Sequence, residues 1–269
     1  MKKTFVNHFL FLVITLLSAM TIEANSQTQS NPQGVVRRQN VPAKNIVMVH
    51  GAFADGSGFK DIYRILASKG FNVTIVQNPL TSLKDDVDAT LRALDKQDGA
   101  TVLVGHSWGG TVITEAGMHP NVVALVYIAA FQPGEGENTA RWASSLPAAP
   151  ENGTLPPDAK GVVYFDKAKF HAGFAGDLSK EEAEFLEASQ GPIFGKCFTT
   201  NVKEAAWKIK PSYGIVATED KAINPDIQRN MYRRSGTSII ELKGSHLIYM
   251  SKPAEVANVI ITAVEANGK

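Results

Sequence analysis

Short apolar runs alternate with amphipathic stretches from Asn45 to the end of the chain. The apolar runs are nearly continuous and rich in β-branched residues, which predicts strands buried on both faces of a parallel sheet. They are Ile46–Val49, Asn72–Val76, Thr101–Val104, Val122–Ala129, Ser212–Ala217 and Ser238–Leu242. The stretches between them predict helices at Phe59–Lys69, Leu83–Asp95, Gly110–His119, Asp226–Arg234 and Pro253–Ala266. This alternation predicts an α/β protein with a doubly wound, mainly parallel sheet of about six strands.

One long interval, from about residue 131 to about residue 210, breaks the alternation. It contains several Pro and Gly residues and many aromatic residues, but no long apolar run. A connection of this length is either functional or a small unit of its own. We expect a helical cap over one end of the sheet, with Trp142 as a candidate residue of a substrate pocket.

The start of the chain follows a different pattern. Two lysines near the N-terminus precede the apolar run Phe9–Leu17, and small residues including Ala19 and Ala24 follow. This arrangement is typical of a secretory signal peptide, and the run is shorter than the ~20 residues that span a bilayer. We expect cleavage near Ala24, or alternatively near Ala19. The expected organisation is a signal peptide over residues 1–24, a flexible leader over 25–43 and a folded domain over 44–269.

Composition restricts the partners. The chain has 27 Lys and Arg against 26 Asp and Glu, so its formal net charge of +1 offers no basic surplus for nucleic acid. The single cysteine, Cys197, excludes an intramolecular disulfide and a cysteine-based zinc site. No metal-ligand spacing such as H-E-x-x-H occurs. We therefore expect no nucleic-acid partner, no metal and, once the signal is removed, no membrane contact.

A candidate nucleophile follows the third predicted strand. Residues 105–110 read Gly-His-Ser-Trp-Gly-Gly, which contains the pattern G-x-S-x-G between a strand and a helix. In that context the serine lies on a sharp turn at the beginning of a helix, whose dipole favours developing negative charge. Ser107 is therefore the candidate nucleophile.

A serine nucleophile needs a base and a group that orients the base. His246 lies in a loop after the last predicted strand, and Asp220 lies three residues past the strand that ends at Ala217. The carboxyl ends of parallel strands share one edge of the sheet, and the order Ser107, Asp220, His246 is the chain order of serine hydrolases with this pattern. Four other acids compete with Asp220, namely Glu219, Asp226, Glu135 and Glu137.

The segment His50-Gly51-Ala52-Phe53 follows the first strand and can supply oxyanion donors. The expected pair is the backbone N–H of Ala52 and that of Trp108, the residue after the nucleophile. Phe53 is a second candidate pocket residue. A phosphate-binding loop is excluded because Ser57 stands where its lysine is needed, and the G-x-G-x-x-G spacing for a dinucleotide is also missing.

These motifs resemble those of the α/β-hydrolase superfamily from about Lys44 to Ala266. The chain looks most like the small serine-esterase branch that includes plant methylesterases and hydroxynitrile lyases. The resemblance implies an α/β-hydrolase fold, a helical cap and no cofactor. Two residues argue against other activities known in this superfamily. The lyases have Thr where this chain has Gly51, which argues against lyase activity. The dehalogenases have Asp where this chain has Ser107, which argues against halide displacement.

We therefore expect an exported serine hydrolase, periplasmic or secreted, that acts as a carboxylesterase. Its expected partner is a small or medium apolar ester, cleaved through an acyl-enzyme on Ser107. Lactonase or perhydrolase activity would use the same triad. The alternative from another class is a ligand-binding protein of this fold with a slow or inactive triad.

Overall fold

The computed structural model of the protein describes residues 43–268. The expected signal peptide and most of the expected leader lie outside the described residues. Within the described part, no helix has the length and apolar character needed to cross a membrane.

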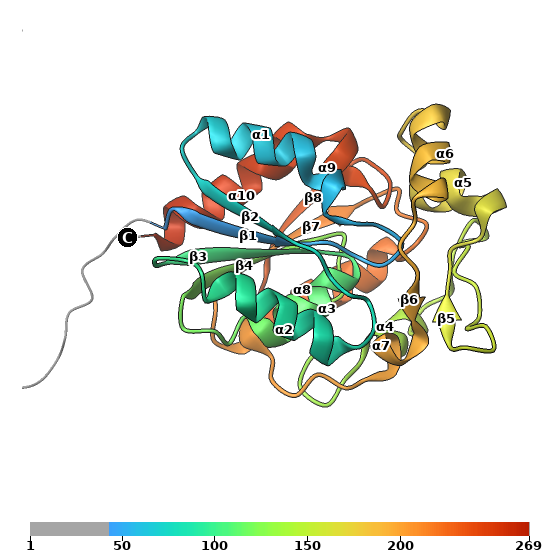
Figure 1. Cartoon of the computed structure of the whole chain (residues 1–269), viewed down its shortest axis with the longest axis horizontal. Helices are drawn as coiled ribbons and strands as arrows, with labels where there is room; N and C mark the ends of the chain where they lie inside the picture. Colours follow the sequence, from blue (N-terminus) through green and yellow to red (C-terminus); the bar gives the residue numbers. More distant parts are fainter. Residues whose placement is uncertain (1–42, 269) are drawn as a thin grey trace, which may run out of the picture. The chain divides into compact units, whose positions relative to one another are not determined.

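The central sheet has six strands, and every neighbouring pair is parallel. Its order is β2-β1-β3-β4-β7-β8 (Figure 1). The strands are β1 (Asn45–Val49), β2 (Asn72–Val76), β3 (Thr101–His106), β4 (Val122–Ile128), β7 (Ser212–Ala217) and β8 (Ser238–Leu242). The predicted fold class is confirmed, because helices cover both faces of a parallel sheet.

Figure 1 shows the helices of the domain in two layers on either side of this sheet. One layer contains α1 (Lys60–Ser68) and α10 (Pro253–Asn267), which contact each other. The other contains α2 (Leu83–Leu94), α3 (Trp108–Ala116) and α8 (Pro225–Ser235). A 3-10 turn, Gly56–Phe59, leads into α1, and the short helix α9 (Ile248–Ser251) precedes α10.

Two sequence expectations need correction. The outermost strands β2 and β8 have exposed positions and are not buried on both faces, because an edge strand has a neighbour on one side only. Helix α3 begins at Trp108 and not at Gly110, because the turn at Ser107 leads directly into the first helical residue.

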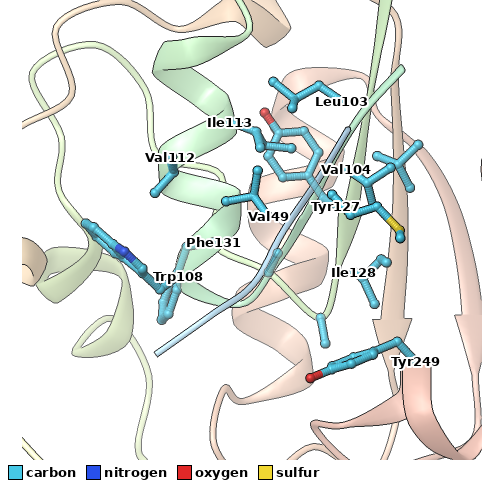
Figure 2. Packing of buried hydrophobic residues seen from close by; sticks show 14 of the residues in the cluster. Val49, Leu103, Val104, Trp108, Val112, Ile113, Tyr127, Ile128, Phe131 and Tyr249 are labelled. Atoms are coloured by element: carbon cyan, nitrogen blue, oxygen red, sulfur yellow. The ribbon is translucent and has the colours of Figure 1, made fainter. Parts of the chain in front are cut away.

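The core lies between the inner strands and the two helical layers. Val49, Val104, Ile113 and Tyr127 are among its fully buried side chains (Figure 2). The tyrosine hydroxyl reaches the Thr114 hydroxyl at 3.1 Å, so the one polar atom of that ring is not left without a partner.

The segment between β4 and β7 forms a cap beyond the carboxyl ends of the strands (Figure 1). Its elements are α4 (Thr139–Ala143), β5 (Val162–Val163), α5 (Phe170–Phe174), α6 (Lys180–Ala188), β6 (Ile193–Phe194) and α7 (Gly195–Thr199), with 3-10 turns at Lys167–Lys169 and Ala206–Lys208. Strands β5 and β6 pair antiparallel, so the cap is mainly but not entirely helical.

Candidate active site

Ser107 lies on a strained turn between β3 and α3. Its φ of 53° and ψ of −121° fall where a residue with a Cβ rarely lies. The flanking glycines allow this turn, since a Cβ at Gly105 would approach the Gly109 carbonyl oxygen to 2.6 Å. A Cβ at Gly109 would approach the Val49 carbonyl oxygen to 2.4 Å. The pattern G-x-S-x-G therefore reflects the close approach of helix and strands on either side of the serine.

The structure brings Ser107, His246 and Asp220 into one hydrogen-bonded chain. The His246 Nε2 atom lies 2.8 Å from the Ser107 Oγ, and its Nδ1 atom lies 2.7 Å from the Asp220 Oδ2. With Nδ1–H donating to the carboxylate, Nε2 is free to accept the serine proton. All three residues are buried, so water does not compete strongly for these bonds.

The Asp220 carboxyl group has four hydrogen-bond partners, none of which is a Lys or Arg side chain. Its Oδ1 accepts the backbone N–H groups of Ala222 and Ile223 at 2.8 and 2.9 Å. Its Oδ2 accepts the side-chain N–H of the fully buried Gln228 at 2.8 Å as well as the His246 ring. Sequence reasoning did not find Gln228, which faces Asp220 from α8.

The competing acids lie in other ion pairs, and none contacts His246. Glu219 pairs with Lys243, Asp226 with Arg229, and Glu135 with Lys208. Glu137 pairs with Arg234 at 2.7 Å.

Trp142 does not line the pocket, and that prediction is wrong. Its indole N–H donates to Glu137, and the Arg234 guanidinium stacks 4.5 Å from the ring centroid. Burial alone would raise the pKa of Glu137, but hydrogen bonds from Arg234, the Gly134 amide and this indole lower it to about 2. The face of α4 that carries Thr139 and Ala143 turns to the pocket instead.

Two buried, neutral histidines beside the site form hydrogen bonds with the backbone of neighbouring loops. His106 Nε2 lies 3.0 Å from the His246 carbonyl oxygen, to which it donates. Burial, with a smaller contribution from the neighbouring His246, holds the pKa of His106 well below its ordinary value. His50 donates from Nδ1 to the Gly51 carbonyl and accepts the Asn78 N–H at Nε2, and burial lowers its pKa as well.

Both expected oxyanion donors belong to segments that adjoin Ser107. Trp108 is the first residue of α3, so its N–H has no acceptor inside the helix. Ala52 follows β1 in a loop so close to the turn that a Cβ at Gly51 would lie 2.7 Å from the Ser107 Cβ. Among residues 43–268, neither amide donates a hydrogen bond to another backbone group, whereas the next amide, that of Phe53, bonds the Gly191 carbonyl.

A cavity of about 360 Å³ opens above Ser107 and His246. Its aromatic lining consists of Phe53, Trp108, Phe131, Phe165, Phe174 and Phe198. Among the described residues that line it there is no Lys, Arg, Asp or Glu. The cavity therefore favours uncharged, largely apolar molecules. Elsewhere in the described part of the chain, no cluster of His, Cys, Asp and Glu could hold a metal ion.

A buried acid supports the pocket wall from behind. Asp86 is fully buried and accepts the Trp108 indole N–H and the Leu80 backbone N–H, both at 2.7 Å. Burial raises the pKa of Asp86 from its ordinary 3.8 to about 6, although these two bonds favour the ion. The sequence did not reveal Asp86, because carboxylates in an amphipathic helix such as α2 are usually exposed to solvent.

The chain belongs to the alpha/beta hydrolase family, whose model matches residues 46–259. A norfluorocurarine synthase from a Strychnos species is 25% identical over 82% of this chain and 96% of its own. A pyrethroid hydrolase from Sphingobium wenxiniae is 25% identical over 82% of this chain and 88% of its own. The crystal structure of a pyrethroid hydrolase from Sphingobium faniae has a TM-score of 0.70 at 21% identity, covering 83% of this chain and 98% of that one. The expected resemblance to this superfamily is confirmed.

The burial of Asp86 predicts a pH dependence of stability. The pKa of Asp86 is higher in the folded protein than its ordinary value, so its contribution is largest at low pH and is lost as pH rises through about 6. Between about pH 5 and about pH 7.5 the wild type should lose roughly 1.4 kcal/mol of unfolding free energy from this group.

Asp86→Asn should lack this loss, as measured by urea unfolding of both proteins at the two pH values. Asp88→Asn, which alters the exposed pair of Asp88 with Lys84, is the matched control. If the unfolding free energy of the wild type and of Asp86→Asn changed equally with pH, the raised pKa of Asp86 would be contradicted.

Proposed function

We propose that this protein is a serine hydrolase that cleaves carboxylic esters through an acyl-enzyme on Ser107. The observation that carries the proposal is the hydrogen-bonded chain from Ser107 through His246 to Asp220 at the foot of an apolar cavity. Membership of the alpha/beta hydrolase family and the similarity to a pyrethroid hydrolase support it.

In the first half of the reaction, the Ser107 Oγ attacks the ester carbonyl carbon while His246 Nε2 takes the serine proton. The carbonyl oxygen becomes an oxyanion, and the N–H groups of Ala52 and Trp108 are the donors that we propose for it. Asp220 keeps the imidazole in the reactive tautomer and stabilises the imidazolium. When the tetrahedral intermediate collapses, the ester C–O bond breaks and His246 returns its proton to the leaving alcohol.

In the second half, water replaces the alcohol beside His246. The imidazole takes one water proton as the water oxygen attacks the acyl carbon, and the same two amides hold the oxyanion. Collapse breaks the acyl–Oγ bond, the proton returns to Ser107, and the carboxylic acid leaves. Each half uses a neutral His246, which its two hydrogen-bond partners hold in place.

The lining of the cavity supports a substrate class. No Lys, Arg, Asp or Glu of the described residues lines the cavity, so a charged ester would lose its hydration there without compensation. Each methylene buried against the aromatic wall contributes about 0.8 kcal/mol, or roughly fourfold in affinity. We propose small or medium apolar esters as substrates.

The triad assignment predicts that Ser107→Ala lowers kcat for a short-chain p-nitrophenyl ester by about 10⁴-fold or more. Asp220→Asn should lower it by a similar order, because the amide favours the wrong imidazole tautomer. Glu219→Gln is the matched control, since Glu219 lies one position away and pairs with the exposed Lys243. Full activity in Asp220→Asn, or a collapse of activity in Glu219→Gln, would show that the acid is assigned wrongly.

The cavity wall predicts a change of chain-length preference. Phe198 lines the cavity and packs edge-on against Trp108, with ring centroids 5.7 Å apart. Phe198→Ala should move the acyl chain with the highest kcat/KM to a longer one, because the lost ring leaves room for added methylenes. The control is Phe185→Ala, which truncates an exposed cap aromatic. If the dependence of kcat/KM on acyl length were unchanged in Phe198→Ala, Phe198 would not contact the acyl chain of the substrate.

We also propose that the protein is exported, on the basis of the basic start, the apolar run Phe9–Leu17 and the small residues after it. N-terminal sequencing of the protein recovered outside the cytoplasm should then begin just after Ala24 or Ala19. Leu16→Asp interrupts the apolar run and should leave the chain uncleaved in the cytoplasm. An intact N-terminus on active cytoplasmic wild-type protein would refute export.

A further inference from the structure

The loop that carries His246 is held from three directions. It lies between β8 and α9, and two of its contacts come from the sheet edge. His106 donates to the His246 carbonyl at 3.0 Å, and the Glu219 N–H donates to the Gly244 carbonyl at 3.0 Å. The third contact comes from the cap.

The cap contact is made by Asp177, in the loop between α5 and α6. Its Oδ2 accepts the Ser245 N–H at 2.9 Å and the Ser251 hydroxyl at 2.6 Å, while its Oδ1 accepts the Ser245 hydroxyl. In the described part of the chain no Lys, Arg or His forms an ion pair with this carboxylate. Its charge is therefore stabilised by Ser245, directly before His246, and by Ser251, at the end of α9.

The protonation state of Asp177 fits this role. Partial burial by itself would disfavour the carboxylate, but the hydrogen bonds from Ser245 and Ser251 outweigh it and hold the pKa below its ordinary value. Asp177 is consequently an ion at neutral pH, and a stronger acceptor than a neutral group.

The same stretch of cap also touches the imidazole ring. Phe174, three residues before Asp177, has its ring centroid 4.8 Å from that of His246 and lines the cavity. The cap therefore contacts His246 twice, on its ring through Phe174 and on its flanking backbone through Asp177. A shift of residues 174–177 would move the base relative to the nucleophile.

We infer that Asp177 is a positioning residue, an inference that rests on the proposed ester hydrolysis. Asp177 connects the cap to the His246 loop and thereby keeps His246 Nε2 within hydrogen-bond distance of the Ser107 Oγ. Asp177 does not line the cavity, so it acts on the alignment of the base and not on substrate contact. A misplacement of about 1 Å in reacting groups can cost about a hundredfold in rate.

The test compares Asp177→Asn with two other variants. The amide keeps the shape, but its NH₂ group cannot accept the bonds that one carboxylate oxygen accepts. We expect kcat to fall by about ten- to a hundredfold while KM stays within about twofold. Ser251→Ala removes one donor and should lower kcat by less. Asp158→Asn is the matched control, because Asp158 accepts the Lys160 and Val162 amides in another cap turn, and it should keep the wild-type kcat.

A second readout separates this inference from the proposed function. The rate at which diethyl p-nitrophenyl phosphate phosphorylates Ser107 reports the alignment of serine and base without any ester turnover, and it should fall in Asp177→Asn in proportion to kcat. Thermal unfolding confirms that each variant is folded. If the wild type reacts with this reagent but cleaves no ester, the proposed function fails while the inference is still tested. If Asp177→Asn matches Asp158→Asn in phosphorylation rate, or changes only KM, the inference is overturned.

Discussion

The close packing of α3 against the carboxyl ends of β1 and β4 is the constraint on which the rest of the site depends. A Cβ at Gly109 would approach the Val49 carbonyl to 2.4 Å, and one at Gly110 would approach the Phe131 carbonyl to 2.2 Å. With helix and strands this close, the chain must turn sharply at Ser107, and the strain of its positive φ is held by the packing on both sides. The nucleophile and the first amide of α3 are thus placed before any substrate arrives.

The buried carboxyl group that faces the imidazole is surrounded by neutral hydrogen-bond donors. Asp220 accepts two backbone amides and the Gln228 side chain in addition to the His246 ring. Such donors satisfy the carboxyl oxygens without placing a second cation beside the imidazole. His50 and His106 stay neutral through burial, so the polar frame around His246 adds no positive charge that would oppose its protonation during the reaction.

Local patterns predicted the strands, the main helices and the nucleophile turn, because each depends on residues close together in sequence. The same reasoning exaggerated the burial of β2 and β8, since an apolar run does not reveal whether its strand lies at an edge. It missed Gln228, Asp86 and Asp177, which act through contacts between elements far apart in the chain. It also misplaced Trp142, because a five-residue helix such as α4 is too short for its sequence period to show which face meets the pocket.

The aromatic residues of the cap connect recognition with chemistry. Phe174 packs against Phe53 and Phe165 in the cavity wall and against the ring of His246. Apolar groups at that position exclude water from the imidazole, and in a medium of lower dielectric its bonds to Ser107 and Asp220 are stronger. A substrate that fills the cavity removes further water from the same place. The wall that we propose to bind apolar esters would therefore also strengthen the electrostatic interactions that act on them.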